Sequence, residues 1–185
     1  MKFAPLVPVC LCRRRLLGLA LLTPLGAGLS ACSDKSANAR SLAPVEIDGA
    51  SSCALDGMLL ADYGGPKAQI HYGDDKAPVF LCDTLEMFHQ LLRPEVVRQV
   101  LAVYVQDMGR ADWDMPQGHW IAAGSAWYVR GSRRKGSMGP TLASFAQQAE
   151  AQKFAAEHGG TVLAYAQIKP EMVDLSGGSK FETRM

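Results

Sequence analysis

The chain has 185 residues, of which 48% are hydrophobic, and it carries 19 lysines and arginines against 18 aspartates and glutamates. A chain of this length forms one compact domain or two small ones. Its nearly balanced charge does not favour nucleic-acid binding, which requires a broad basic face, so we expect no nucleic-acid partner.

The first 31 residues have the pattern of a bacterial lipoprotein signal peptide. Arg13–Arg15 precede a short apolar run, Leu16–Leu22, which is too short and too interrupted for a membrane-spanning helix. The sequence Leu29-Ser30-Ala31-Cys32 resembles a lipobox, in which the cysteine is lipidated and becomes the new N-terminus. We therefore expect Cys32 to carry a membrane anchor. An ordinary secretory signal is the alternative, and the arginine run also suits twin-arginine export.

Removal of residues 1–31 leaves a mature chain of 154 residues with 15 basic and 18 acidic residues, a net charge of −3. Of the five cysteines, only Cys53 and Cys82 then remain as thiols. Two thiols in an oxidising compartment ordinarily form a disulfide. A Cys53–Cys82 disulfide is therefore the main alternative to the metal site considered below.

The mature chain is predicted to begin with a flexible tether, 32–44, and to end in a flexible tail, 171–185, because both segments are polar and rich in small residues. Between them we expect a first unit over 45–108. Its predicted elements are a strand, a second strand, a helix with Asp83 as N-cap, and a third strand, at 67–72, 78–82, 83–92 and 100–105.

A second unit is expected over 109–170. It should contain strand material at 121–130, a Gly-rich loop at 131–139, a helix from about residue 141 to His158, and a last strand at 161–166. Both halves then follow a β-β-α-β order, and a Thr-Leu-x-x-Phe pattern recurs at the two expected helix starts. The predicted fold class is α+β, built from two related β-β-α-β units.

The catalytic options in this sequence are few. It has no Gly-x-Ser-x-Gly, no His-Glu-x-x-His, no P-loop and no dinucleotide-binding fingerprint. No local signature joins a cysteine to one of the four histidines. A structural zinc site is also not indicated, because Asp56 occupies the second cysteine position of a Cys-x-x-Cys motif that begins at Cys53. We therefore expect the protein not to be an enzyme.

Sulfur-containing residues in turns are the most informative feature. Cys53 and Met58 flank a turn, and Met138 lies within Gly136-Ser137-Met138-Gly139-Pro140. Methionine usually fills cores, but a methionine among Gly, Ser and Pro has little core to fill. Thiolate and thioether ligands select Cu(I) over zinc, iron or magnesium. Two or three such ligands suffice for Cu(I), so a third can come from Met138 or from a histidine.

Several stretches together resemble the NosL family: Cys53-Ala-Leu-Asp-Gly-Met58, Gly65-Pro66-Lys67-Ala68-Gln69, Trp127-Tyr128-Val129 and Gly136–Thr141. The resemblance covers nearly the whole mature chain, including the lipobox. It implies two β-β-α-β units and a periplasm-facing, lipid-anchored Cu(I) chaperone, and Ser33 after the cysteine fits sorting to the outer membrane.

The resemblance also implies a client, a partner and a ligand set. The client would be the copper–sulfide centre of nitrous oxide reductase, and the docking partner an ABC-type membrane assembly complex. The implied copper ligands are Cys53 and Met138, followed by Met58. Some relatives have a cysteine where this chain has Asp56. Cys82 offers a soft donor at a helix start, where a thiolate is favoured.

Two other function classes are also compatible with the sequence: a thiol redox protein and an interaction module without metal.

A further expectation concerns Arg133-Arg134-Lys135 in the loop 131–139. We expect this loop to move, and its three charges either form a solvated turn or dock an acidic face of the membrane complex.

Overall fold

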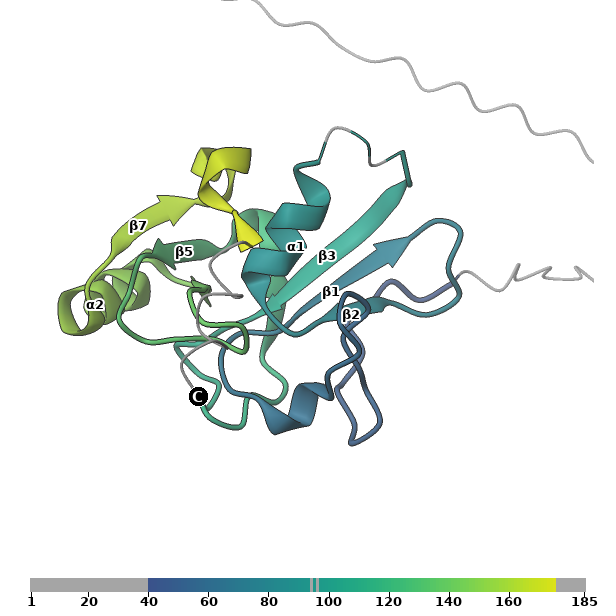
Figure 1. Cartoon of the computed structure of the whole chain (residues 1–185), viewed down its shortest axis with the longest axis horizontal. Helices are drawn as coiled ribbons and strands as arrows, with labels where there is room; N and C mark the ends of the chain where they lie inside the picture. Colours follow the sequence, from purple (N-terminus) through teal and green to yellow (C-terminus); the bar gives the residue numbers. More distant parts are fainter. Residues whose placement is uncertain (1–39, 94, 96, 176–185) are drawn as a thin grey trace, which may run out of the picture. The chain divides into compact units, whose positions relative to one another are not determined.

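The computed structural model describes residues 40–93, 95 and 97–175. These residues form an α+β fold with two antiparallel sheets and two α-helices, as predicted (Figure 1). The predicted signal peptide, Cys32, residues 33–39 of the tether and residues 176–185 lie outside the described part of the chain. Within that part, no helix combines the length and apolar character needed to cross a membrane.

The first unit is a sheet with one helix. Its strands β1 (Ala68–Tyr72), β2 (Val79–Leu81) and β3 (Val100–Gln106) are joined by β4 (Trp120–Ala122), in the order β2-β1-β3-β4. All five residues of β1 are buried, as a central strand requires. Helix α1 (Thr84–Leu91) begins where the sequence predicts, because the Asp83 carboxylate accepts a hydrogen bond from the Leu85 amide at 2.7 Å.

The second unit repeats this arrangement. Strands β5 (Trp127–Arg130), β6 (Leu142–Phe145) and β7 (Thr161–Ala164) pair antiparallel in the order β6-β5-β7, and helix α2 (Gln148–His158) connects β6 to β7. In each unit the first strand is therefore central, with the second and third strands on either side. The β-β-α-β order predicted for both halves is present in the structure.

Two boundaries in the second half differ from the prediction. The helix expected from residue 141 begins at Gln148, because Leu142–Phe145 form β6. All four residues of β6 are buried, so the segment lacks the alternation of apolar and polar residues by which a half-exposed strand is recognised in a sequence. The strand material at 121–130 is two strands, and β4 pairs with β3 of the first sheet, with Tyr104 opposite Ala122. The recurring Thr-Leu-x-x-Phe pattern therefore marks the start of α1 in the first half but strand β6 in the second half.

Two hydrophobic clusters form the core. The larger contains Ile70, Tyr72 and Phe88 with Tyr128 of the other sheet, so it joins the two units. Four short 3-10 helices complete the described chain: Leu60–Asp62, Ala123–Ser125, Tyr165–Gln167 and Pro170–Met172.

Both predicted flexible ends make contacts where they are described. Within the predicted tether, the Leu42 carbonyl accepts a hydrogen bond from the Tyr104 hydroxyl at 2.8 Å. Within the predicted tail, Val173 is 2% exposed and its carbonyl lies 3.0 Å from His89 Nδ1. Residues 40–44 and 171–175 therefore belong to the folded unit, contrary to the prediction for these stretches.

Candidate metal centre

A closed loop presents the first thiol. Ser52 and Leu59 form an isolated antiparallel bridge, and inside it the Cys53 amide donates to the Met58 carbonyl at 2.8 Å. The loop turns at Gly57, whose φ of 80° is a conformation that favours glycine. Asp56 Oδ1 accepts from the Met58 amide at 2.9 Å. The turn expected between Cys53 and Met58 is therefore present, and its own backbone bonds fix the position of Cys53.

The second thiol lies where β2 meets α1. Cys82 directly follows β2 and directly precedes Asp83, the N-cap residue of α1. Glu86 is in the first turn of the helix, four residues after Cys82. The Ala54 amide donates to the Phe80 carbonyl at 2.9 Å, which attaches the Cys53 loop to β2. The two cysteines, 29 positions apart in the sequence, are thus brought to one place.

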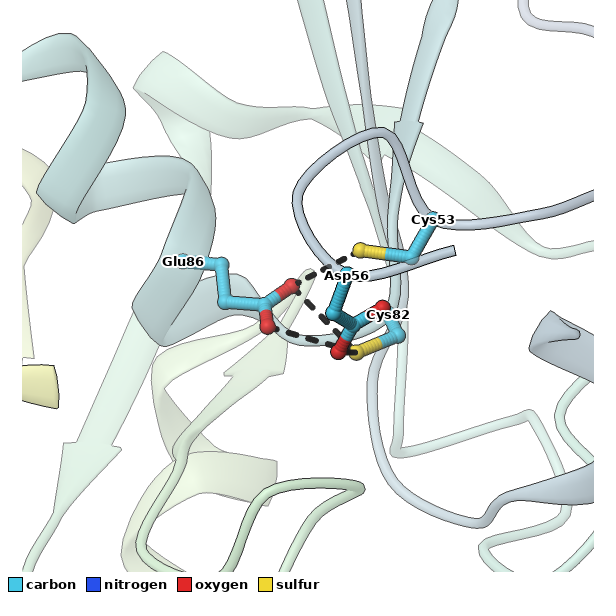
Figure 2. Close-up of side chains that lie close together, drawn as sticks. All are labelled: Cys53, Asp56, Cys82 and Glu86. Carbon is cyan, nitrogen blue, oxygen red and sulfur yellow. Dashed lines mark hydrogen bonds between the residues drawn. The ribbon is translucent and has the colours of Figure 1, made fainter. Parts of the chain in front are cut away.

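Four side chains converge at this place: Cys53, Asp56, Cys82 and Glu86 (Figure 2). One donor atom from each lies within 4.8 Å of all the others. Both thiols donate to the Glu86 carboxylate, Cys53 at 3.3 Å and Cys82 at 3.3 and 3.4 Å to its two oxygens. Cys82 Sγ is also 3.8 Å from Asp56 Oδ2. Glu86, on the helix, therefore bridges thiols that belong to the loop and the strand end.

Burial and hydrogen bonding make the two thiols unequal. Cys53 and Cys82 are 2% and 0% exposed. Interaction with the neighbouring Cys82 thiol lowers the pKa of Cys53, and the Leu55 amide also donates to Cys53 Sγ at 3.4 Å. The same partnership with Cys53, together with burial, raises the pKa of Cys82. Burial raises the pKa of Glu86 as well. Cys53 is therefore the thiol prepared to ionise first.

Met138 lies beside this group. It is half-buried, packs against the larger core cluster, and lines a cavity of about 80 Å³ together with Asp56 and Glu86. The rest of the cavity wall is mostly apolar and includes Leu55, Leu85, Pro140 and Leu175. Met58 is half-buried at the end of the Cys53 loop. The structure thus brings Met138, distant in sequence, to a cavity that it shares with Asp56 and Glu86, the two carboxylates of the converging group.

The structure adds Cys82, Asp56 and Glu86 to the residues that the sequence resemblance indicates. Glu86 was missed because its place in the first turn of a helix has an ordinary explanation as part of a cap. The spacing Cys82-x-x-x-Glu86 at a helix start was the available signal, since residues four apart share a helix face. Both cysteines are free thiols in this structure, and the converging group contains no histidine.

The donor set has a clear chemical character. Two thiols suit soft ions such as Cu(I), and Zn²⁺ also accepts cysteine and carboxylate ligands. The thiols are buried while Asp56 is exposed, so the group is open to solvent on one side. A site with an open side and an adjacent cavity allows a ligand from another molecule to approach the metal.

Comparisons with known proteins agree with this chemistry. The sequence model of the NosL family matches residues 44–173. The chain belongs to the NosL family. It is 40% identical over 152 residues to the copper-binding lipoprotein NosL of Stutzerimonas stutzeri, covering 82% of this chain and 79% of that protein. It is 39% identical over 149 residues to the protein of the same name from Achromobacter cycloclastes, covering 78% and 76%.

A solved structure gives the same result for the fold. The crystal structure of the copper chaperone NosL from Shewanella denitrificans superimposes with a TM-score of 0.66 at 36% identity, covering 70% of this chain and 96% of that one. The predicted family and the α+β fold class are therefore confirmed. The expectation that the chain is not an enzyme is confirmed too, since the named relatives are copper-binding proteins and a copper chaperone. The ligand roles of Cys53, Met58 and Met138 stay predictions.

Proposed function

We propose that this protein is a membrane-anchored, periplasm-facing Cu(I) metallochaperone that delivers copper for maturation of the copper–sulfide centre of nitrous oxide reductase. The observation that carries the proposal is the pair of buried thiols bridged by Glu86, with Met138 lining the adjacent cavity. Relatives named as copper-binding lipoproteins and as a copper chaperone support it.

In this proposal Cys53 and Cys82 hold copper as thiolates, and Met138 adds a thioether. Met58, in the Cys53 loop, is the remaining candidate donor. The soft donors select Cu(I), while Asp56 and Glu86 supply negative charge beside the cation. Copper is cargo, so retention and release both matter. A metal held by two or three sulfur atoms leaves a position free, through which a partner's ligand enters before the chaperone's ligands leave.

The lipid anchor at Cys32 belongs to the same proposal. It keeps the chaperone on a membrane surface, with outer-membrane sorting as the finer expectation, and an ABC-type membrane complex as the docking partner. A Cys32→Ser variant should then be recovered from the soluble periplasmic fraction. Unchanged membrane fractionation of this variant would exclude lipidation at Cys32 as the anchor.

The decisive experiment is a Cu(I) titration of the reduced soluble form against a competing chelator. Cys53→Ser and Cys82→Ser should each weaken binding by more than about 100-fold, beyond the effect of losing a residue that only supports a ligand. Met138→Leu should weaken it less, because a neutral thioether is a weaker donor than a thiolate. Met115→Leu is the matched control, since Met115 is 71% exposed and lies outside the group.

X-ray absorption on the loaded protein should show sulfur neighbours around copper. Only nitrogen and oxygen neighbours, or equal affinity of Cys53→Ser and parent, would contradict the site. A Zn²⁺ titration in parallel tests whether the carboxylates direct a harder ion to the same residues. A protein that takes up no metal but forms a reversible Cys53–Cys82 disulfide would favour the thiol redox alternative.

Delivery needs its own measurement. Strains that carry Cys53→Ser should make nitrous oxide reductase deficient in copper when the metal is limiting, and excess copper should restore part of the enzyme. Full copper content of the reductase in that strain would exclude the proposed role in its maturation, even if the chaperone binds Cu(I).

A further inference from the structure

Lys67 occupies an unusual position for a lysine. Among the described residues it is the only lysine or arginine that is buried, with 0% exposure, at the residue just before β1. Buried lysines require partners. The Lys67 ammonium donates to the Gly64 carbonyl at 2.9 Å and to Ser137 Oγ at 2.7 Å. The second contact joins the start of β1 to the residue next to Met138.

Ser137 continues this connection to a thiol-bearing residue. Its hydroxyl donates to the Cys82 carbonyl at 2.6 Å while it accepts from Lys67. The hydroxyl also lies 3.2 Å from the Gly64 carbonyl. A chain of two short hydrogen bonds thus runs from the buried ammonium, through Ser137, to the backbone of Cys82.

The segment that carries Ser137 and Met138 is a tight turn. Gly136 and Gly139 pair through both backbone hydrogen bonds, at 2.8 and 3.2 Å, so Ser137 and Met138 are the two residues at its tip. The direction of the Met138 side chain therefore depends on how this turn is held.

Close packing at Gly65 and Gly136 holds the turn against its neighbours. A Cβ added to Gly65 would lie 2.6 Å from Gly136 Cα, and a Cβ added to Gly136 would lie 2.1 Å from Asp83 Oδ2. Beyond the turn, Thr141 Oγ1 donates to Asp83 Oδ1 at 2.8 Å. The turn is fixed against the start of α1 on both sides of Met138.

The charge of Lys67 is also well placed. Burial lowers the pKa of Lys67, and four acidic groups act in the opposite direction: Asp83, Cys82, Glu86 and Cys53. These groups therefore attract the ammonium when they are ionised. A neutral residue at this position would lose both the hydrogen bond to Ser137 and this attraction.

We propose that Lys67 and Ser137 are positioning residues that hold the Met138 thioether at the thiol pair, and so determine how long bound copper is retained. This inference rests on the proposed function, because it concerns the same site. The two thiols bind copper, and the Lys67–Ser137 connection keeps the third sulfur in reach.

The test measures the rate at which the Cu(I)-loaded protein loses copper to an excess of a chromogenic chelator. Ser137→Ala should speed the loss by about 10- to 100-fold, the range for residues that orient a ligand. Ser137→Thr keeps the hydroxyl and should stay close to the parent. Lys67→Leu removes the ammonium without adding a thioether and should resemble Ser137→Ala, and its thermal unfolding shows whether the variant is folded.

A double variant decides whether Ser137 acts through Met138. In a Met138→Leu background, Ser137→Ala should add nothing to the rate of copper loss. X-ray absorption should report the same loss of one sulfur neighbour in Ser137→Ala as in Met138→Leu. Independent, additive effects on the rate, or a Ser137→Ala variant with parental rate and sulfur number, would overturn the proposal.

A metal-free measurement separates this inference from the proposed function. In the apo protein, the Met138 methyl group should become more mobile on the nanosecond timescale in Ser137→Ala but not in Ser137→Thr, as reported by NMR relaxation. Unchanged methyl dynamics would contradict the positioning role. Failure of the parent to bind Cu(I) at all would contradict the proposed function instead.

Discussion

The two β-β-α-β units share a strand order but differ at the connection between the second strand and the helix. Both connections have two residues: Cys82 and Asp83 in the first unit, Ala146 and Gln147 in the second. Each helix has a glutamate at its third position, Glu86 or Glu150. Glu86 is buried against two thiols, whereas Glu150 is half-exposed and Ala146 is exposed.

The helices differ in the same sense. Asp83 caps α1 with its side chain, and four residues of α1 are buried. Gln147 makes no side-chain cap to α2, whose only buried residue is Ala151. The comparison teaches that a repeated topology does not repeat its chemistry. The first unit has a capped, buried helix start that holds ionisable groups, and the second contributes the turn with Met138.

The largest expected effect comes from truncating an aromatic residue in each helix. Phe88 in α1 is fully buried and packs edge-on against Tyr128, with ring centroids 4.9 Å apart. Phe88→Ala should lower the free energy of unfolding by about 3–5 kcal/mol. Phe154→Ala in α2 should cost only about 1–2 kcal/mol, because this ring is half-buried. Urea unfolding of the metal-free protein measures both, and equal losses would contradict the difference in helix burial.

The next effect concerns the caps. Asp83→Ala removes the acceptor for both the Leu85 amide and the Thr141 hydroxyl, so it should destabilise the protein by about 2 kcal/mol. Asp83→Asn keeps an acceptor oxygen and should cost less. Gln147→Ala should be nearly neutral, because no side-chain cap is lost. Thermal unfolding of the three variants tests this order, and a cost for Gln147→Ala as large as that of Asp83→Ala would contradict it.

A smaller, pH-dependent effect should come from His71 in the central strand of the first unit. Burial, with the charge of Arg40, lowers the pKa of His71. The unfolded chain then binds more protons than the folded one near and below pH 6.5. The stabilising contribution is present above pH 6.5 and is lost as the pH falls through the lower folded-state pKa. Denaturation of the metal-free protein at several pH values should show this loss, and His71→Phe should reduce it. An identical pH dependence in His71→Phe would exclude His71 as its source.

The smallest effect on copper binding is expected from the basic run of the second unit. Arg133 donates to the Glu157 carbonyl at 2.7 Å, and Arg134 lies 3.7 Å from Asp114 and over the ring of Trp113. An exposed ion pair such as Arg134–Asp114 contributes about 0–1 kcal/mol to stability. Replacement of Arg133, Arg134 and Lys135 by Ser and Gln should leave Cu(I) affinity nearly unchanged. If these charges dock a partner, copper delivery should slow, most at low ionic strength, where screening is weakest.

Much of the first unit was predictable, because its signals agree with one another. Asp83 is a good N-cap, β1 is closed by a turn, and the helix has an apolar stripe. In the second unit, the Thr-Leu-x-x-Phe pattern favoured a helix after Thr141, yet Leu142–Phe145 form a strand buried on both faces. Periodicity cannot separate a short, fully buried strand from a helix. The structure instead makes Gln148 the counterpart of Thr84, as the first residue of each helix.

The candidate site was half predictable for a related reason. In the sequence, Cys53 and Met138 stand in predicted turns, where a sulfur-containing side chain is not expected to fill a core, although the structure packs both at the larger core cluster. Glu86 and Cys82 have ordinary explanations as a helix residue and a buried thiol. Only the pairing of the Cys53 loop with β2, through Ala54 and Phe80, brings them together. Contacts between distant segments are not visible in local patterns.

The position of β4 has a consequence for dividing the protein. A cut at the boundary predicted from the sequence, between residues 108 and 109, would separate β4 from the sheet to which it belongs. Tyr104, Val105 and Gln106 would then lose their partners in β4 and present an unpaired strand edge. Unpaired edges recruit strands from other molecules and promote aggregation. An N-terminal fragment that stays monomeric must therefore continue past Ala122.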